Sequence, residues 1–172
     1  MVVSSYAPKT DVLTHPDRVE AVGRLLPCGE GTPAALQQFI DHVAELLHAP
    51  CAGVSLILTD AGMLVATHGV SGWLAEAGGL PAEWAPCATV VRNDAPLLIT
   101  DTHDDPAHVT NPLVMITGVR SYAGVPLHSN GQPVGSLCVL SGEPHAFTTA
   151  DLDVLTGLAS RAVELLRAGI YG

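Results

Sequence analysis

The 172-residue chain carries seven Lys and Arg against seventeen Asp and Glu, which gives a formal charge of −10 at pH 7. This negative charge repels phosphate backbones and anionic lipid headgroups, so the composition argues against direct binding of nucleic acid or of a membrane surface. A hydrophobic content of 48% excludes a disordered chain, and no apolar run is long enough to span a bilayer. We expect one soluble domain, located in the cytoplasm because the N-terminus lacks a secretory signal.

The first fifty residues predict a loose arm followed by two helices. Residues 1–13 show no clear periodicity. A short helix is predicted next, with Pro16 in its first turn and with Pro27 and Gly29 at its end. A longer helix over residues 33–48 begins at Pro33 and places its apolar residues on one face: Leu36, Phe39, Ile40, Val43, Leu46 and Leu47.

Two β-hairpins are predicted, one in each half of the chain. The first has its turn around Asp60 and Gly62, and its first strand is apolar on both faces, as expected for a central strand. The second turns at Asn130-Gly131, the strongest hairpin signal in the sequence. Between the hairpins, residues 71–96 predict short helical pieces, and the segment PLLITD predicts a compact strand that ends at Asp101.

Polar residues follow this strand in the segment DTHDDPAHVTNPLV, residues 101–114. Asp105 and Asn111 each precede a proline, where a short polar side chain can cap a helix whose first residue is proline. The second of these helices is expected to end at Gly118. The segment therefore predicts two helix caps and leaves four polar residues as candidates for a functional site: Asp101, His103, Asp104 and His108.

The C-terminal segment predicts a long helix that begins with a capping box formed by Thr148 and Asp151. Its apolar residues repeat with alternating spacings of three and four: Leu152, Leu155, Ala159, Ala162 and Leu166. Such a stripe can pack on the domain's own sheet or form a seam with a second copy of the helix.

The four cysteines lie far apart and form no C-x-x-C pair, so the sequence contains neither a zinc ribbon nor a thioredoxin-type motif. We expect Cys28, Cys51, Cys87 and Cys138 to be buried free thiols.

Taken together, these segments resemble a GAF domain over about residues 30–168, and in particular its common bacterial form. The resemblance rests on a Cys before a short helix in PCATVVRNDAP, a strand that ends in Asp, the D-x-P and N-P turns, RSYAGVPL, the NG turn, VGSLCVLS and the capped final helix. It implies an α+β fold with a central antiparallel sheet of five or six strands. The first and last helices cover one face, and residues 71–94 and 101–117 roof a pocket on the other. The expected division is an arm and short helix over 1–30, the GAF domain over 31–168 and a tail over 169–172.

The resemblance leaves several functions open, because GAF domains bind cyclic nucleotides, bilins, haem, nitrate or other small molecules, or bind nothing and dimerise. We expect a small-molecule sensor or regulatory module that dimerises through residues 33–48 and 148–167 and signals to another protein. A small GAF-fold enzyme and a structural dimeriser without a pocket are the alternatives.

Nine residues are candidates for ligand contacts. Trp73 and Trp84 lie in the predicted roof, where an indole can wall a cavity. Arg120 and Tyr122 share one strand face, on which Gly124 would open space for an anionic or carbonyl-bearing ligand, unless that face packs against the helices. The full candidate set is Trp73, Trp84, Cys87, Asp101, His103, Asp104, His108, Arg120 and Tyr122.

Some of these residues are also the candidates for an enzymatic or a metal-binding function. Asp101, His103 and His108 offer metal-ligand or acid-base chemistry, although their spacing matches no tight metal motif. Haem ligation would use His103, His108 or His128. The cyclic-nucleotide set N-K…F…D-E is missing, and CAT replaces the His that follows the cysteine in bilin-binding domains. The sequence defines no cofactor.

A redox enzyme would use Cys87 as its thiol, since this residue lies near the first cysteine position of the free methionine-(R)-sulfoxide reductases. The second position of that subfamily carries the signature H-I-A-C-D, where this chain reads HVTNP. Because Asn111 stands where the nucleophile is expected, the sequence argues against this activity. Cys87 and Cys138 would be an unconventional alternative pair.

Overall fold

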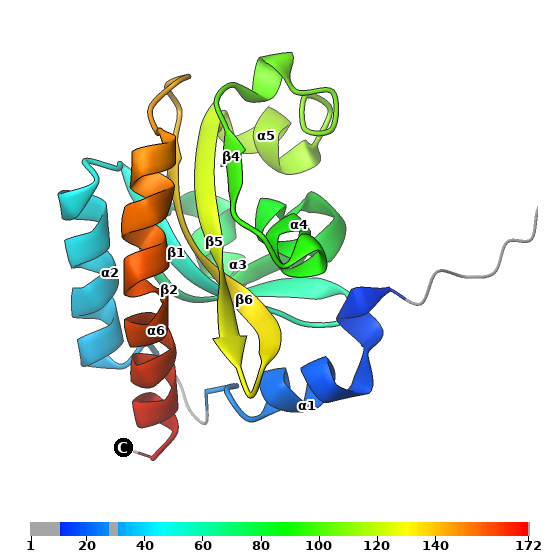
Figure 1. Ribbon diagram of the computed structural model, residues 1–172. Coiled ribbons are helices and arrows are strands. Elements are labelled where there is room, and N and C mark those ends of the chain that lie inside the picture. Colours follow the sequence, from blue (N-terminus) through cyan, green and yellow to red (C-terminus); the bar gives the residue numbers. More distant parts are fainter. Residues whose placement is uncertain (1–10, 28–30, 172) are drawn as a thin grey trace, which may run out of the picture.

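A six-stranded antiparallel sheet in the order β3-β2-β1-β6-β5-β4 forms the centre of the computed structural model, which describes residues 11–27 and 31–171 (Figure 1). The strands are β1 (Cys51–Ile57), β2 (Ala61–His68), β3 (Gly79–Pro81), β4 (Leu97–Ile99), β5 (Ser121–Ser129) and β6 (Gln132–Ser141). The helices are α1 (Pro16–Gly23), α2 (Ala34–Leu46), α3 (Gly72–Ala77), α4 (Pro86–Asn93), α5 (Pro112–Thr117) and α6 (Thr149–Tyr171), with short 3-10 helices η1 (Val12–Thr14), η2 (Ala82–Trp84) and η3 (Thr102–Asp104). This is the predicted α+β architecture with the larger of the two expected strand numbers.

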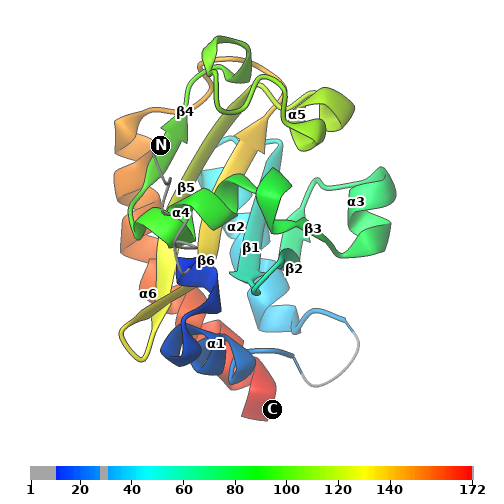
Figure 2. The same ribbon diagram turned by 90° about the vertical axis from the view of Figure 1, so that its right-hand side faces the viewer.

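Helices cover both faces of the sheet. α2 and α6 lie next to each other on one face, and α3, α4 and α5 lie on the other, as Figures 1 and 2 show. The main hydrophobic core fills the space under α2 and α6, and a second core lies between α4 and the sheet. The two faces therefore have the roles that the sequence predicted, one packed by long helices and one roofed by short ones.

The apolar stripe of α6 packs on the chain's own sheet. Leu155, Ala162 and Leu166 are buried in the main core, and Leu152 and Ala159 pack against it. One half of the predicted capping box is present: the Thr148 backbone N–H donates to the Asp151 carboxylate at 2.8 Å, whereas the Asp151 N–H donates to the Thr148 backbone carbonyl oxygen at 3.1 Å. The inward direction of the stripe means that any contact with a second copy through α6 uses the other side of this helix.

The N-terminal helix α1 is attached to the sheet through a buried arginine. Arg18 is 1% exposed, and its guanidinium donates hydrogen bonds to the carbonyl oxygens of Ile57, Leu13 and Leu58 at 2.7, 2.9 and 3.2 Å. Residues 1–10 and 28–30, with most of the predicted arm, Cys28 and Gly29, lie outside the described residues, as does Gly172. Helix α6 continues to residue 171, beyond the boundary predicted at 168.

Both predicted hairpins are present. Asn130 and Gly131 have positive φ angles of 52° and 75° between β5 and β6, as a type I′ turn requires. Strand β1 pairs with β2 on one side and with β6 on the other, which confirms its interior position. None of the helices in the described part of the chain is long and apolar enough to cross a membrane.

Candidate ligand-binding cleft

A cleft of about 330 Å³ lies between α3, α5 and the adjoining ends of β1 and β6. This volume is at the lower end of the range found for small-molecule sites. Nine of the thirteen described lining residues are apolar or glycine, and this set is Cys51, Gly69, Val70, Ser71, Trp73, Leu74, Leu113, Ile116, Thr117, Val119, Leu140, Ser141 and Gly142.

Among the residues that the structure describes, no Asp, Glu, Lys, Arg or His lines this cleft. The Cys51 thiol donates to the Gly69 carbonyl oxygen at 3.3 Å, and burial raises the pKa of Cys51, so this sulfur is neutral. The Thr117 hydroxyl donates to the Leu113 carbonyl oxygen of its own helix at 2.6 Å. The few polar groups are therefore largely satisfied within the protein, and the surface left for a ligand is apolar and uncharged.

Asn111 fixes the helix that forms one wall of the cleft. Its side-chain oxygen accepts a hydrogen bond from the Leu113 N–H at 2.9 Å, which confirms the predicted cap of α5. Its amide nitrogen donates to the Trp84 carbonyl oxygen at 3.0 Å and so joins α5 to η2. Gly118 ends α5 with a φ of 74°, in the left-handed conformation expected of a helix C-terminus. Asp105, the other predicted cap, accepts from the Ala107 N–H at 2.9 Å but begins a turn, since residues 106–110 form no helix.

Of the nine candidate ligand residues, Trp73 alone is part of this cleft lining. It lies on α3 and is 37% exposed, and the exposed Ile116 of α5 belongs to the same lining. Trp84 is half-buried on η2 and contributes its carbonyl oxygen to the bond with Asn111. The two tryptophans therefore occupy different environments within the roof.

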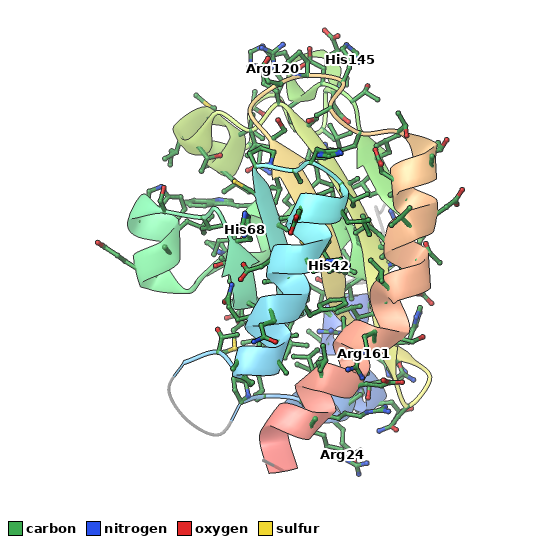
Figure 3. All side chains as sticks on the ribbon, turned by 90° about the vertical axis from the view of Figure 1, so that its left-hand side faces the viewer. Arg24, His42, His68, Arg120, His145 and Arg161 are labelled. Atoms are coloured by element: carbon green, nitrogen blue, oxygen red, sulfur yellow. The ribbon has the colours of Figure 1, made fainter. Side chains whose placement is uncertain are left out.

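Asp101 and Arg120 form a bidentate ion pair at the end of the sheet. Nε and one terminal nitrogen of Arg120 each donate to a different carboxylate oxygen of Asp101 at 2.8 Å. These bonds hold the pKa of Asp101 well below its ordinary value, and the pairing raises the pKa of Arg120. Figure 3 shows the position of Arg120 at this end of the molecule. Because Asp101 already occupies two of its donors, an anionic ligand at Arg120 would have to compete with the carboxylate.

The remaining residues of the predicted rim do not converge. His103 and Asp104 are exposed on η3, whereas His108 is buried and its Nδ1 lies 3.2 Å from an Asp105 oxygen without hydrogen-bond alignment. His128 lies elsewhere, beside Asp94. Within residues 11–27 and 31–171, no three His, Cys, Asp or Glu side chains are arranged to hold a metal ion. Asp101, His103 and His108 thus form no such ligand group in the structure.

Tyr122 and Cys87 lie in the second core, between the sheet and α4. This position assigns Tyr122 to the roofed face of the sheet, a point the sequence left open. Gly124 follows on the same face, but the Tyr122 phenol lies directly over it, and a Cβ there would collide with the ring. The open space predicted at Gly124 is therefore filled by its neighbour.

The sequence suggested Cys138 as an alternative redox partner of Cys87 but did not identify the hydroxyl groups beside the two thiols. Its sulfur lies 3.1 Å from the Tyr122 hydroxyl and 3.7 Å from the Cys138 sulfur, and the Tyr122 hydroxyl lies 3.4 Å from that of Ser136. Ser55 faces Ser136 across the β1–β6 pair. The period-two alternation of Ser136, Cys138 and Leu140 along β6 was the signal that these side chains share a face.

Hydrogen bonding in this cluster gives the two thiols different pKa values. The Cys138 thiol, aided by the Tyr122 and Ser136 hydroxyls, lowers the pKa of Cys87, although burial acts in the opposite direction. The same contact with Cys87, together with burial, raises the pKa of Cys138, and burial keeps Tyr122 protonated by raising its pKa. Cys87 is therefore the thiol that ionises first.

An antiparallel sheet with long helices on one face and a cleft under short helices on the other defines a class of α+β domains. The family model described as GAF domain matches residues 32–165, and the chain belongs to this family. No curated protein sequence was found to match it.

Solved structures share this fold at low sequence identity. The type II free methionine-R-sulfoxide reductase of Thermoplasma acidophilum has 17% identity and a TM-score of 0.64, with 80% of this chain and 93% of that one covered. The GAF domain of an Acinetobacter phosphoenolpyruvate-protein phosphotransferase has 15% identity and a TM-score of 0.63, with coverages of 90% and 95%. A domain of a Sinorhizobium meliloti sensor histidine kinase has 17% identity and a TM-score of 0.60, with coverages of 81% and 95%. At these identities the similarity concerns the fold alone.

Proposed function

We propose that this GAF domain is a small-molecule sensor whose α3–α5 cleft binds an uncharged, mainly apolar ligand. The observation that carries the proposal is the lining of the cleft, which has a volume of about 330 Å³ and, within residues 11–27 and 31–171, no charged side chain. An ionic ligand would lose its hydration there without gaining a counter-charge, whereas an apolar ligand gains the burial of its surface.

This proposal narrows the ligand class expected from the sequence. Arg120 was expected to orient an anionic or carbonyl-bearing ligand, but Asp101 neutralises it and Asp104 and Glu143 add further negative charge nearby. The formal charge of −10 opposes anions as well. Contacts of a ligand with Asp101, His103, Asp104 and His108 stay a prediction, as does the cytoplasmic location.

The test compares two dyes with the same ring system, the neutral phenylnaphthylamine and the anionic anilinonaphthalene sulfonate. The chain has two tryptophans, of which Trp73 lines the cleft and Trp84 does not. In a Trp84→Phe variant, Trp73 becomes the single tryptophan reporter. We expect the neutral dye to accept energy from Trp73 and quench its emission in a saturable way, and the sulfonate to do so at least tenfold more weakly.

A pair of glycine variants provides the control for binding position. A Cβ at Gly142, which lines the cleft, would meet only the Gly118 carbonyl oxygen at 3.7 Å, and a Cβ at Gly157 on α6 would meet nothing within 4 Å. Gly142→Leu should therefore fill part of the cleft and weaken the neutral dye, while Gly157→Leu leaves its affinity unchanged. Equal affinities in both variants, or tighter binding of the sulfonate, would refute the proposal.

We also propose dimerisation through residues 33–48 and 148–167, with the signal passing to a partner protein. Supporting this, α2 and α6 lie together on the outside of one face (Figure 3), where Leu46 and Val154 are 47% and 38% exposed. Native mass spectrometry should show a dimer that Leu46→Glu weakens. Val109→Glu, at an exposed apolar residue of the opposite face, is the matched control. A monomer at all protein concentrations would refute this part.

A further inference from the structure

Two thiols meet in the second core, where α4 packs on the sheet (Figure 2). Cys87 lies in the first turn of α4 and Cys138 at the middle of β6, and their sulfurs are 3.7 Å apart although the residues are 51 positions apart in sequence. Both side chains are buried. We propose that Cys87 and Cys138 are a dithiol pair that a hydroperoxide converts to a disulfide, which links α4 covalently to the sheet. This inference is independent of the ligand proposed for the α3–α5 cleft.

The geometry around Cys138 allows the sulfurs to approach. A disulfide requires a distance of about 2.05 Å, so the separation must shorten while the side chains rotate. Cys138 is paired across the sheet with Gly53 of β1 on one side and with Gly124 of β5 on the other. A Cβ at Gly53 would lie 3.9 Å from the Cys138 sulfur, so the missing side chain leaves room on that side.

Hydroxyl groups surround the thiol pair and supply hydrogen bonds to its reactive forms. Tyr122 lies 3.1 Å from the Cys87 sulfur and can donate its proton to a thiolate there. The Ser55 hydroxyl is buried, 2% exposed, and has no hydrogen-bond partner in the structure, so it is free to donate to a sulfur or sulfenate. An unpaired buried hydroxyl is costly, and an oxygen introduced at Cys87 would provide the missing partner.

One hydroperoxide molecule is sufficient to oxidise the two thiols, and hydrogen peroxide is the smallest such oxidant. The Cys87 thiolate attacks one peroxide oxygen, the O–O bond breaks, and the departing hydroxide takes up the proton that Cys87 had lost and leaves as water. This oxidises Cys87 to a sulfenic acid. The Cys138 sulfur then attacks the Cys87 sulfur, the S–O bond breaks, and the hydroxyl leaves as water with the Cys138 proton. Two thiols are oxidised to one disulfide and the peroxide is reduced to two waters.

Cys51 is the natural comparison within the same fold. It is half-buried at the start of β1, and its thiol donates a hydrogen bond to the Gly69 carbonyl oxygen. Burial raises its pKa, in contrast to the lowered pKa of Cys87. Selective oxidation of the Cys87–Cys138 pair therefore distinguishes this proposal from general thiol reactivity.

The experiment uses the full chain with Cys28→Ser and Cys51→Ser, which leaves only the proposed pair. These substitutions are needed because trypsin releases Cys28, Cys51 and Cys87 on one peptide, residues 25–92, and Cys138 on another, residues 121–161. We expect hydrogen peroxide to join these peptides in the folded protein, with loss of two hydrogens, and a thiol reductant to separate them. Peroxide treatment should also raise the melting temperature by roughly 4–16 °C.

Single variants test the order of events. In Cys138→Ser, which has no resolving thiol, a sulfenic acid should accumulate at Cys87, whereas Cys87→Ser should leave Cys138 reduced under the same treatment. The same peroxide treatment of the unaltered chain checks that the result does not depend on how the variants fold. In that chain, fragmentation of the joined peptides identifies which cysteines are linked. The proposal is overturned if the folded protein forms no Cys87–Cys138 link, or forms it only after denaturant has unfolded the chain.

Discussion

Replacement of Asn111 is expected to destabilise α5, the helix that forms one wall of the cleft. The loss of stability has two parts, one for each hydrogen bond of the Asn111 side chain. The side chain makes one hydrogen bond that caps α5 and a second that reaches the Trp84 carbonyl oxygen. Loss of an N-cap costs about 1 kcal/mol, and loss of an ordinary hydrogen bond costs about 1 kcal/mol more. Asn111→Ala should therefore reduce the free energy of unfolding by about 2 kcal/mol and the melting temperature by roughly 4–8 °C.

Asn111→Asp separates the two contributions. Its carboxylate keeps the cap and gains from the helix dipole, but it has no N–H to donate to Trp84. We expect a loss of about 1 kcal/mol or less for this variant. Chemical denaturation followed by circular dichroism measures both losses. Equal losses for the two variants would show that the cap contributes nothing, and a loss for Asn111→Ala below ~0.5 kcal/mol would refute the account of both bonds.

Three further outcomes follow from named contacts. Asp101→Asn should destabilise the protein most at neutral pH. Because the pKa of Asp101 is lowered in the folded state, its contribution to stability is complete above the ordinary carboxyl pKa and disappears as the pH falls through the folded-state pKa. The melting temperatures of the variant and the unaltered protein should therefore converge on acidification. Gly124→Ala should lower the melting temperature because its Cβ collides with the Tyr122 phenol, whereas Gly53→Ala, whose Cβ would meet ordinary contacts, should change it little. Arg18→Met should cost roughly 3–5 kcal/mol in urea titrations, since it removes three hydrogen bonds from the guanidinium to backbone carbonyl oxygens.

The elements that the sequence predicted well are those whose determinants are local. The Asn130-Gly131 turn needs only two residues that tolerate positive φ, and the cap of α6 lies within the four residues from Thr148 to Asp151. The GAF fold could be predicted because several such local signals occur in the order the family requires. The short β3 was not predicted, since a three-residue strand gains its structure from pairing with β2 and leaves little pattern of its own.

The candidate site was harder to predict because its contacts join distant residues. The Asp101–Arg120 pair spans 19 positions, and the sequence alone gave each residue a ligand role that pairing with the other opposes. Gly124 was read as empty space, but a glycine in a strand also receives the side chain of its neighbour two positions away. Polarity marked residues 101–108 as the candidate rim, whereas the cleft is apolar and so resembled ordinary core in the sequence.

Strand β6 connects the two proposed sites and also keeps them distinct. Its residues Ser136, Cys138 and Leu140 share the roofed face, where Cys138 contacts Cys87 and Leu140 lines the cleft. Leu140 also packs against the core that contains the thiols, so it lies between the two sites. Because the thiol chemistry needs no residue of the cleft and the cleft lining includes neither Cys87 nor Cys138, failure of one proposal leaves the physical basis of the other intact.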